Sequence, residues 1–291
     1  MGIWLRPVWP RTEIVGGASV STFIHGGNVQ ANGIRQHYLR YGGQAHSNKP
    51  ALILIPGITS PAITWGFVAE RLGQHFDTYV LDARGRGLSS TGPELDYSVD
   101  TCADDISTFA TAMNLDAYHL VGHSMGARFI ARSAVRQPQG LQKLVLIDPP
   151  VSGPGRREYP SKLPWYVDSI RQAQLGMDAE AMRAFCATWT DEQLQLRAEW
   201  LHTCYEPAIV RAFNDFHEVD FHQDLPKLPV PALLIVAGRG GVILAEDEAE
   251  ILELQPDMRI AHVANAGHMI PWDDLEGFFA AFGDFLGETI A

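Results

Sequence analysis

The chain has 291 residues, long enough for one large domain or two small ones, and its 46% hydrophobic and 19% charged residues are typical of a globular protein. Acidic residues outnumber basic residues by 34 to 22, and the formal net charge of -12 argues against a nucleic acid or an anionic membrane surface as partner. No apolar stretch reaches the roughly 18 residues of a membrane-spanning helix, and residues 1–10 hold no apolar segment of signal-peptide length.

The three cysteines, Cys102, Cys186 and Cys204, are widely spaced and form no CxxC pair. This pattern indicates free thiols in a reducing compartment, so we expect a cytoplasmic protein whose core forms without disulfides. A thiol nucleophile is the alternative interpretation, but no neighbouring residue favours it.

In chain order, residues 1–20 match no regular element and are expected to form an N-terminal extension. The segments 23–30 and 34–41 follow, and Asn32-Gly33 between them is typical of a hairpin turn. Six apolar runs of strand length come next, at 51–55, 78–81, 117–121, 143–147, 232–236 and 259–263, with helical patterns near 64–73, 99–113, 125–137, 245–255 and 273–286. This alternation predicts an α/β fold with a mostly parallel sheet, buried on both faces, and the hairpin as its antiparallel edge.

The stretch 149–225 departs from this alternation, because it has no strand run but many helix formers and large aromatic residues. A structureless loop of that length is uncommon, so the stretch is predicted to form a helical cap inserted after the sixth strand. The core domain then comprises residues 21–148 and 226–291.

The segment Gly122–Gly126 reads GHSMG and lies between an apolar run and a helical pattern. A G-x-S-x-G motif in that context is typical of a nucleophile elbow, in which a strained turn exposes Ser124 above the sheet edge. The alternative is a glycine-rich turn with an incidental serine. A serine nucleophile needs a general base, and His268, in the loop after the last strand run, is predicted to reach it from the same edge.

Other histidines are less suited to this role. His123, inside the elbow, is expected to pack or to orient its neighbours. The cap histidines His202, His217 and His222 could touch a substrate, but surface or capping roles are favoured for them.

The third member of the triad is not in its usual place. In most enzymes with this elbow the acid follows the strand after the cap, where this chain has Gly241. Asp148 instead ends the strand run before the cap and is followed by two prolines. We predict that Asp148 holds the His268 imidazole in the correct tautomer and stabilises its charged form. Glu246 and Asp247 are the alternative, although they resemble first-turn residues of a helix.

Acyl transfer also needs donors for the developing oxyanion. The elbow chemistry predicts two backbone N–H groups, from Met125 and from Ile58 in the turn after the run 51–55. The glycine-rich loop Asp82–Ser89 lacks the spacing of a phosphate-binding loop, and the sequence holds no cluster of metal ligands. We therefore expect neither a cofactor nor a metal ion.

Taken in order, these motifs resemble the α/β-hydrolase superfamily over residues 22–287. Three segments, Ile55–Ala62, Asp148–Arg156 and Ala237–Ile243, more narrowly resemble the N-formylmaleamate deformylases of aerobic nicotinate degradation. The narrower resemblance implies a triad acid after the strand before the cap, and hydrolysis of an N-formyl amide to formate and maleamate through an acyl-serine.

A small anionic amide under an aromatic cap requires a fixed cation or hydrogen-bond donors. Arg128 and Arg239 are the candidate cations, with structural ion pairs as the alternative role for each. The aromatic candidates for the pocket, for which core packing is the alternative, are Trp65, Trp165, Trp189 and Tyr205.

The residues alone leave other activities open. An enol-lactonase, an acylaminomethylene-acid amidohydrolase and a carbon–carbon hydrolase of ring-cleavage products all use the same elbow. A non-catalytic ligand receptor or a cofactor-free oxygenase on this fold is a further alternative, against which the intact Ser124, His268 and Asp148 argue.

Overall fold

The computed structural model describes residues 21–43 and 48–290, so the expected extension at 1–20 lies outside the described residues. Its centre is an eight-stranded sheet in the order β1-β2-β4-β3-β5-β6-β7-β8. The strands are β1 (Phe23–Ala31), β2 (Ile34–Tyr41), β3 (Ala51–Ile55), β4 (Thr78–Leu81), β5 (Tyr118–His123), β6 (Leu141–Ile147), β7 (Ala232–Ala237) and β8 (Arg259–Val263). The strands from β4 to β8 are paired parallel, whereas β1 and β2 form an antiparallel edge. The predicted fold class is thus confirmed.

The hairpin between β1 and β2 turns at Asn32 and Gly33, which both have positive φ, 44° and 73°. Two successive residues with positive φ match the twist of the flanking strands, which is why asparagine and glycine are favoured at these positions.

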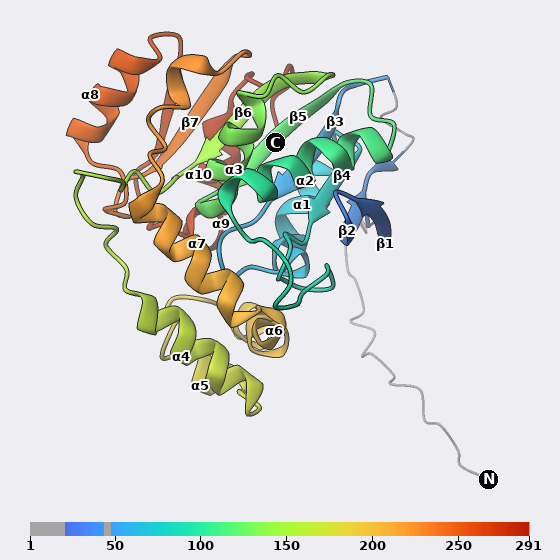
Figure 1. Ribbon diagram of the computed structural model, residues 1–291, viewed down its shortest axis with the longest axis vertical. Helices are drawn as coiled ribbons and strands as arrows, with labels where there is room; N and C mark the ends of the chain where they lie inside the picture. The colour runs from blue at the N-terminus through green and yellow to red at the C-terminus, as the bar shows by residue number, and fades with distance from the viewer. Residues whose placement is uncertain (1–20, 44–47, 291) are drawn as a thin grey trace, which may run out of the picture.

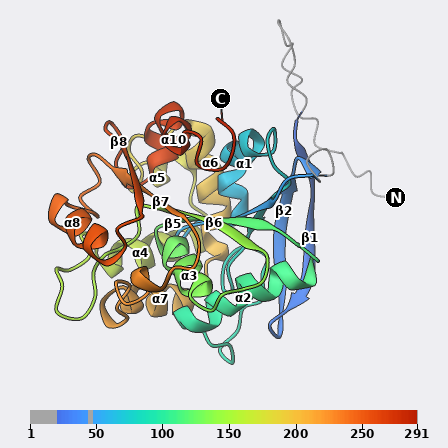
Figure 2. The same ribbon diagram turned by 90° about the horizontal axis from the view of Figure 1, so that it is seen from above.

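Helices cover both faces of the sheet, because the central strands β3 to β7 are apolar on both sides (Figure 2). One face packs against α1 (Gly66–Leu72), α9 (Ile270–Asp273) and α10 (Leu275–Phe282). The other packs against α2 (Val99–Ala112), α3 (Met125–Ala134) and α8 (Ala245–Leu254). The last helix, predicted as one piece over 273–286, is divided because the Asp274 side chain caps a new helix at the N–H of Gly277.

Four helices lie between β6 and β7, in the stretch 149–225 that we call the cap (Figure 1). They are α4 (Leu163–Gln174), α5 (Ala179–Met182), α6 (Asp191–Trp200) and α7 (Glu206–Glu218). Short 3-10 turns complete the chain at η2 (Ala62–Trp65), η3 (Leu201–Thr203) and η4 (Leu225–Lys227). The cap shares a continuous apolar core with α2 and α3, which fixes it on the sheet.

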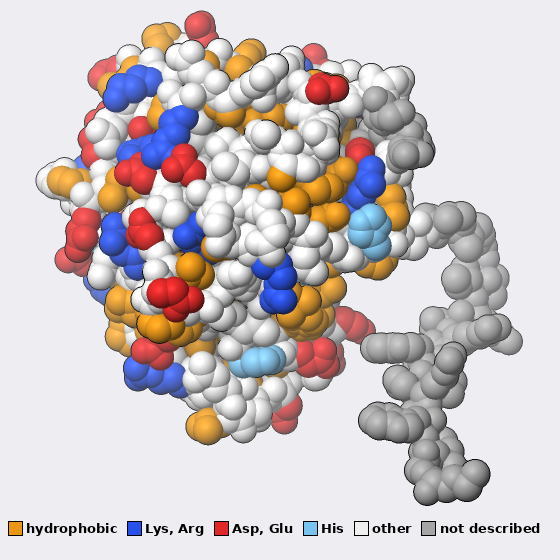
Figure 3. All heavy atoms as spheres, turned by 45° about the vertical axis from the view of Figure 1, so that its right-hand side comes forward, with side chains coloured by type: hydrophobic (Ala, Val, Ile, Leu, Met, Phe, Trp, Pro, Cys, Tyr) orange, Lys and Arg blue, Asp and Glu red, His pale blue; other side chains and the backbone are white. Residues whose placement is uncertain are grey.

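On the face shown in Figure 3, acidic and basic side chains are interspersed and form no large patch of one sign. Among the described residues, none of the helices combines the length and the apolar character needed to cross a lipid bilayer.

Candidate active site

Ser124 stands at the tip of a tight turn between β5 and α3, with φ of 54° and ψ of −117°. Such a conformation is costly for a residue other than glycine and is concentrated at functional sites. The two flanking glycines are needed for space: a Cβ on Gly126 would lie 2.1 Å from the Ile55 carbonyl oxygen, and one on Gly122 would lie 2.5 Å from the Gly126 oxygen. The sequence therefore forms the strained turn that the G-x-S-x-G pattern predicts.

The structure brings Ser124, His268 and Asp148 together in one chain of hydrogen bonds. The Ser124 Oγ lies 2.9 Å from His268 Nε2, and His268 Nδ1 lies 2.6 Å from Asp148 Oδ2. Asp148 is fully buried, and its Oδ1 accepts the Ala237 N–H at 3.2 Å. Because Nδ1 keeps its proton and donates a hydrogen bond to the carboxylate, Nε2 is left unprotonated and can accept the proton of the serine.

Asp148 reaches His268 from the strand before the cap. Its backbone has φ of 44°, and its N–H donates to the Ile235 carbonyl, which holds it at the end of β6. In the turn after the neighbouring strand β7, a Cβ on Gly240 would lie 3.3 Å from Asp148 Oδ2 and 3.2 Å from the backbone nitrogen of His268. The glycine after β7 thus leaves open the space that the displaced carboxylate uses.

Neither of the alternative acids, Glu246 and Asp247, forms a hydrogen bond with His268 among the described residues. Glu246 and Asp247 lie in the first turn of α8, as their pattern indicates. The Asp247 carboxylate accepts from the Arg157 guanidinium and from the Leu244 N–H, and Glu246 is exposed.

The N–H groups of Ile58 and Met125 are unoccupied. Within residues 21–43 and 48–290, neither donates to a backbone or side-chain acceptor, and Met125 is the first residue of α3, whose N–H has no partner inside the helix. The buried Arg86 guanidinium holds both segments, because it donates to the Ile58 carbonyl at 3.1 Å and contacts Met125 Sδ at 3.2 Å. Two backbone donors are therefore available beside Ser124.

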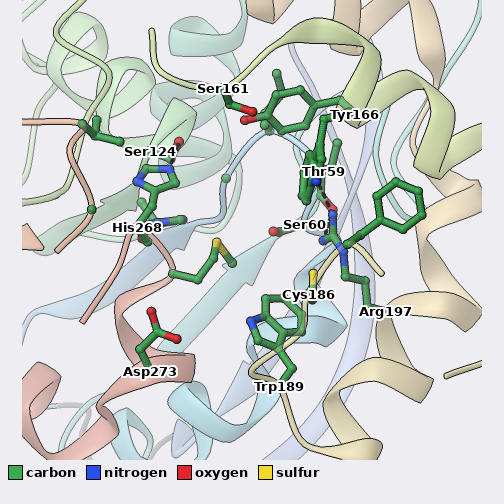
Figure 4. A pocket seen from close by; sticks show the side chains of 18 of the residues that line it. Thr59, Ser60, Ser124, Ser161, Tyr166, Cys186, Trp189, Arg197, His268 and Asp273 are labelled. Atoms are coloured by element: carbon green, nitrogen blue, oxygen red, sulfur yellow. Dashed lines mark hydrogen bonds between the residues drawn. The ribbon is translucent and has the colours of Figure 1, made fainter. Parts of the chain in front are cut away.

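A cavity of about 510 Å³ opens between the core and the cap. Ser124 and His268 lie on one side of it, and Arg197 of α6 lies on the other (Figure 4). Its remaining walls include Ile58, Thr59, Ser60, Tyr159, Ser161, Trp165, Tyr166, Phe185, Cys186, Trp189, Met269 and Asp273. The mixture of aromatic walls and few polar groups suits a small organic ligand.

Tyr159 of the cap contacts Nε2 of His268, the nitrogen that faces Ser124. Its hydroxyl lies 3.2 Å from His268 Nε2, and the Tyr166 hydroxyl donates to it at 3.5 Å. Burial raises the pKa of Tyr159 well above the ordinary value, so this hydroxyl keeps its proton near neutral pH.

His123 packs against the loop that carries His268. Its Nε2 donates to the His268 carbonyl at 2.9 Å, and its ring centre lies 4.8 Å from that of His268. Burial lowers the pKa of His123 to about 3, so the ring is neutral and orients the loop, the role expected from the sequence. The cap histidines His202, His217 and His222 do not line the cavity.

The two arginines that the sequence suggested for the substrate carboxylate do not line the described cavity. Arg128 is buried in α3, and its guanidinium donates to the carbonyl oxygens of Pro150, Ser152, Asp215, Phe216 and Val219. It joins α3 to the ends of the cap and has no access to the cavity. Arg239 lies exposed on the turn after β7, outside the cavity.

The aromatic candidates divide equally. Trp165 and Trp189 line the cavity. Trp65 does not, because it is buried against His123 and Trp272 at the base of η2. Tyr205 is also absent from the walls, since it begins α7 and packs against Tyr97.

The sequence interpretation missed Arg197 and Tyr159. Arg197 has a signal in the sequence, because it shares the helical spacing of Leu194, Ala198 and Leu201 and is a charge on an apolar face, but this spacing does not show which cavity the guanidinium enters. Tyr159 lies in an irregular segment without periodicity, so no pattern could place it.

The thiols offer no competing nucleophile. Burial raises the pKa of Cys102 and of Cys204 to about 12 and also raises that of Cys186, the one cysteine on the cavity wall. A thiol with a raised pKa carries little of the reactive thiolate near neutral pH.

The chain is similar to several known proteins. A curated N-formylmaleamate deformylase from Pseudomonas putida is 75% identical over 271 residues, which cover 93% of this chain and the whole of the relative. The crystal structure of an N-formylmaleamic acid deformylase from another strain of Pseudomonas putida superimposes with a TM-score of 0.84 at 54% identity, covering 88% of this chain and 99% of the other. The structure of E-2-(acetamidomethylene)succinate hydrolase, at 22% identity and a TM-score of 0.73 over 91% of this chain and all of the other, shows the shared fold alone.

The family model described as the alpha/beta hydrolase fold matches residues 50–275, which contain the elbow, Asp148 and His268. The chain therefore belongs to the α/β-hydrolase family.

Proposed function

We propose that the protein hydrolyses the N-formyl amide of N-formylmaleamate, a step of nicotinate catabolism, and releases formate and maleamate. The observation that carries the chemistry is the hydrogen-bonded chain from Asp148 through His268 to Ser124, which opens onto a cavity of about 510 Å³. The 75% identity to a curated N-formylmaleamate deformylase supports the choice of substrate.

The first step is the attack of Ser124 Oγ on the formyl carbon. His268 Nε2, 2.9 Å away, takes the hydroxyl proton as the new C–O bond forms. The formyl oxygen becomes an oxyanion, which the N–H groups of Ile58 and Met125 stabilise. Asp148 stabilises the imidazolium that results and keeps it oriented.

The second step is the departure of maleamate. The C–N bond breaks, and the protonated Nε2 of His268 gives its proton to the leaving nitrogen. That nitrogen also belongs to a second acyl group, so it leaves more easily than an amine would. The formyl group stays on Ser124 as an ester.

The third step regenerates the enzyme. His268 takes a proton from a water molecule, whose oxygen attacks the formyl ester, and the proton then returns to Ser124 as formate leaves. The formyl carbon carries only hydrogen, so the ester offers no steric hindrance to the water.

The three cysteines are unpaired and buried, and from them we infer a cytoplasmic location. The partner in the proposed reaction is a small anionic amide, N-formylmaleamate.

The decisive experiment is formate release from N-formylmaleamate by the purified protein, followed with a formate dehydrogenase. Ser124→Ala protein is the control for adventitious hydrolysis. We expect turnover with the unaltered chain and none above background with the variant. Absence of formate, with hydrolysis of an enol-lactone or of a ring-cleavage product instead, would contradict the proposed substrate.

A further inference from the structure

Arg197 is the one lysine or arginine side chain on the wall of the described cavity. The wall of this cavity has a single carboxylate, that of Asp273, which accepts the Gly267 N–H at 2.8 Å and the Thr188 hydroxyl at 3.4 Å. Figure 4 shows Asp273 well apart from Arg197, toward the side of His268.

Arg197 is a buried cation without an anion. The residue is 3% exposed, and no described carboxylate lies within ion-pair distance of it. Its polar contacts are both with Thr59, where Nη1 donates to the carbonyl and Nη2 to the hydroxyl, each at 3.1 Å. The Nε is buried and has no partner among the described groups. A guanidinium has five N–H donors, so one N–H on each Nη atom of Arg197 is left for a ligand after the two bonds to Thr59.

Two other buried arginines, Arg86 and Arg128, have the contacts expected of an arginine with a purely structural role. Arg86 donates to the carbonyl oxygens of Ile58, Arg84 and Ala208 and contacts Met125 Sδ. Arg128 donates to five carbonyl oxygens. Every nitrogen of Arg86 has a contact, the two Nη atoms of Arg128 share five carbonyl oxygens, and neither arginine lines the cavity. Arg197 differs from both, because it lines the cavity and its printed hydrogen bonds go to Thr59 alone.

Two tryptophan rings contact the Arg197 guanidinium, and they do not neutralise its charge. The guanidinium carbon lies 5.8 Å from the Trp165 ring centre and 5.6 Å from the Trp189 ring centre. Aromatic faces attract a cation but leave its net charge unchanged, and they exclude water from it. The side chain is therefore fixed, charged and available from the cavity.

We propose that Arg197 binds the carboxylate of the substrate and so determines which end of the molecule reaches Ser124; this inference rests on the proposed function. Ser124 and Arg197 face each other across the cavity (Figure 4), which suits a short molecule with an acyl amide at one end and a carboxylate at the other. A planar guanidinium binds a carboxylate through two parallel hydrogen bonds, and each Nη atom of Arg197 makes only one of its two possible bonds to Thr59. Thr59 follows Ile58, so the same contacts tie the carboxylate site to the loop that supplies an oxyanion donor.

The test compares N-formylmaleamate with its neutral methyl ester, using formate release as the readout for both. For Arg197→Gln we expect kcat/KM for the acid to fall about 30- to 100-fold, mainly through KM, because a charged hydrogen-bond pair is lost. The value for the ester should change less than about threefold by the same reasoning. The matched control is Arg239→Gln, which removes an exposed arginine outside the cavity and should leave both substrates unaffected. An equal loss for acid and ester, or no loss for the acid, overturns the proposal.

If the Arg197→Gln protein fails to fold, Arg197→Lys provides a second test of the proposal. It keeps the charge but not the planar pair of donors, so we expect at least a tenfold loss for the acid and little change for the ester. Unchanged kinetics with the acid would overturn the two-bond geometry.

A binding measurement separates this inference from the proposed function. Maleamate is titrated calorimetrically into the Ser124→Ala protein and into the same protein carrying Arg197→Gln. Binding that is lost with Arg197 supports the carboxylate site, even if the unaltered enzyme releases no formate and the proposed function fails. Equal binding to both proteins overturns the carboxylate site, even if formate release succeeds.

Discussion

Asparagine at position 148 should nearly abolish turnover while leaving the fold intact. In the structure Asp148 Oδ1 accepts the Ala237 N–H at 3.2 Å, and Oδ2 faces His268 Nδ1 at 2.6 Å. The amide oxygen of asparagine would keep the first contact, so its NH2 group would face Nδ1. The imidazole must then accept at Nδ1 and carry its proton on Nε2, where it cannot take the proton of Ser124.

The alternative arrangements are also unfavourable. Turning the amide over would place NH2 against the Ala237 N–H, and keeping the proton on Nδ1 would place two donors face to face at a distance of 2.6 Å. Loss of the correct tautomer in a serine triad costs about 10⁴-fold in kcat, a barrier increase of about 5.4 kcal/mol.

The assay is steady-state formate release by Asp148→Asn, with thermal melting as the check on folding. Glu246→Gln is the matched control, because it removes an exposed carboxylate in α8 that has no contact with His268. Turnover within tenfold of the unaltered protein by Asp148→Asn, or a large loss with Glu246→Gln, would refute the assignment of the displaced acid.

Three further outcomes are expected. Ser124→Ala should lower kcat about 10⁶-fold in the formate assay, since it removes the nucleophile, and residual turnover above about 1% would exclude an acyl-serine. Tyr159→Phe deletes the hydroxyl 3.2 Å from His268 Nε2 and should lower kcat about tenfold with KM unchanged; an unaltered kcat would show that this contact does not assist proton transfer. Burial lowers the pKa of His119 from 6.5 to about 4, so the folded state keeps this ring neutral while the unfolded chain binds a proton below about pH 6.5. Stability from His119 is therefore present above pH 6.5 and lost as the pH falls toward 4. Urea unfolding of His119→Gln should show a pH slope flatter by about 1.4 kcal/mol per pH unit in that window, and an unchanged slope would contradict the burial argument.

The fold could be predicted because its signals are local. Continuous apolar runs indicate strands buried on both faces, and Asn32-Gly33 indicates the edge hairpin without reference to distant residues. Ser124 and His268 could be placed for a related reason, since each follows a strand of a parallel sheet and parallel strands end at one edge. Asp148 followed from the same rule once Gly241 was seen in the usual position of the acid.

The substrate side of the cavity could not be predicted in this way. Arg128 and Arg197 are both arginines in helices with apolar neighbours, and their sequences do not reveal where each guanidinium ends. The difference is that cap carbonyl oxygens from Pro150 to Val219 converge on Arg128, whereas Arg197 meets only Thr59 and two tryptophans. Both outcomes depend on how the cap folds back over the sheet, which is a tertiary property.

The placement of Asp148 on β6 has a consequence for the evolution of such enzymes. Neighbouring strands of a sheet lie about 4.8 Å apart. During evolution the acidic residue can therefore be relocated from the end of one strand to the end of the next, and its carboxylate can still reach the same imidazole. The move also needs room beside the new acid, and Gly240, which precedes the customary position at Gly241, leaves that room open, because a Cβ on it would lie 3.3 Å from Asp148 Oδ2. Related enzymes of this fold therefore share the sheet edge and the histidine loop, but not always the position of the acid. A sequence comparison that inspects only the customary acid position would misclassify an enzyme with a complete triad as inactive.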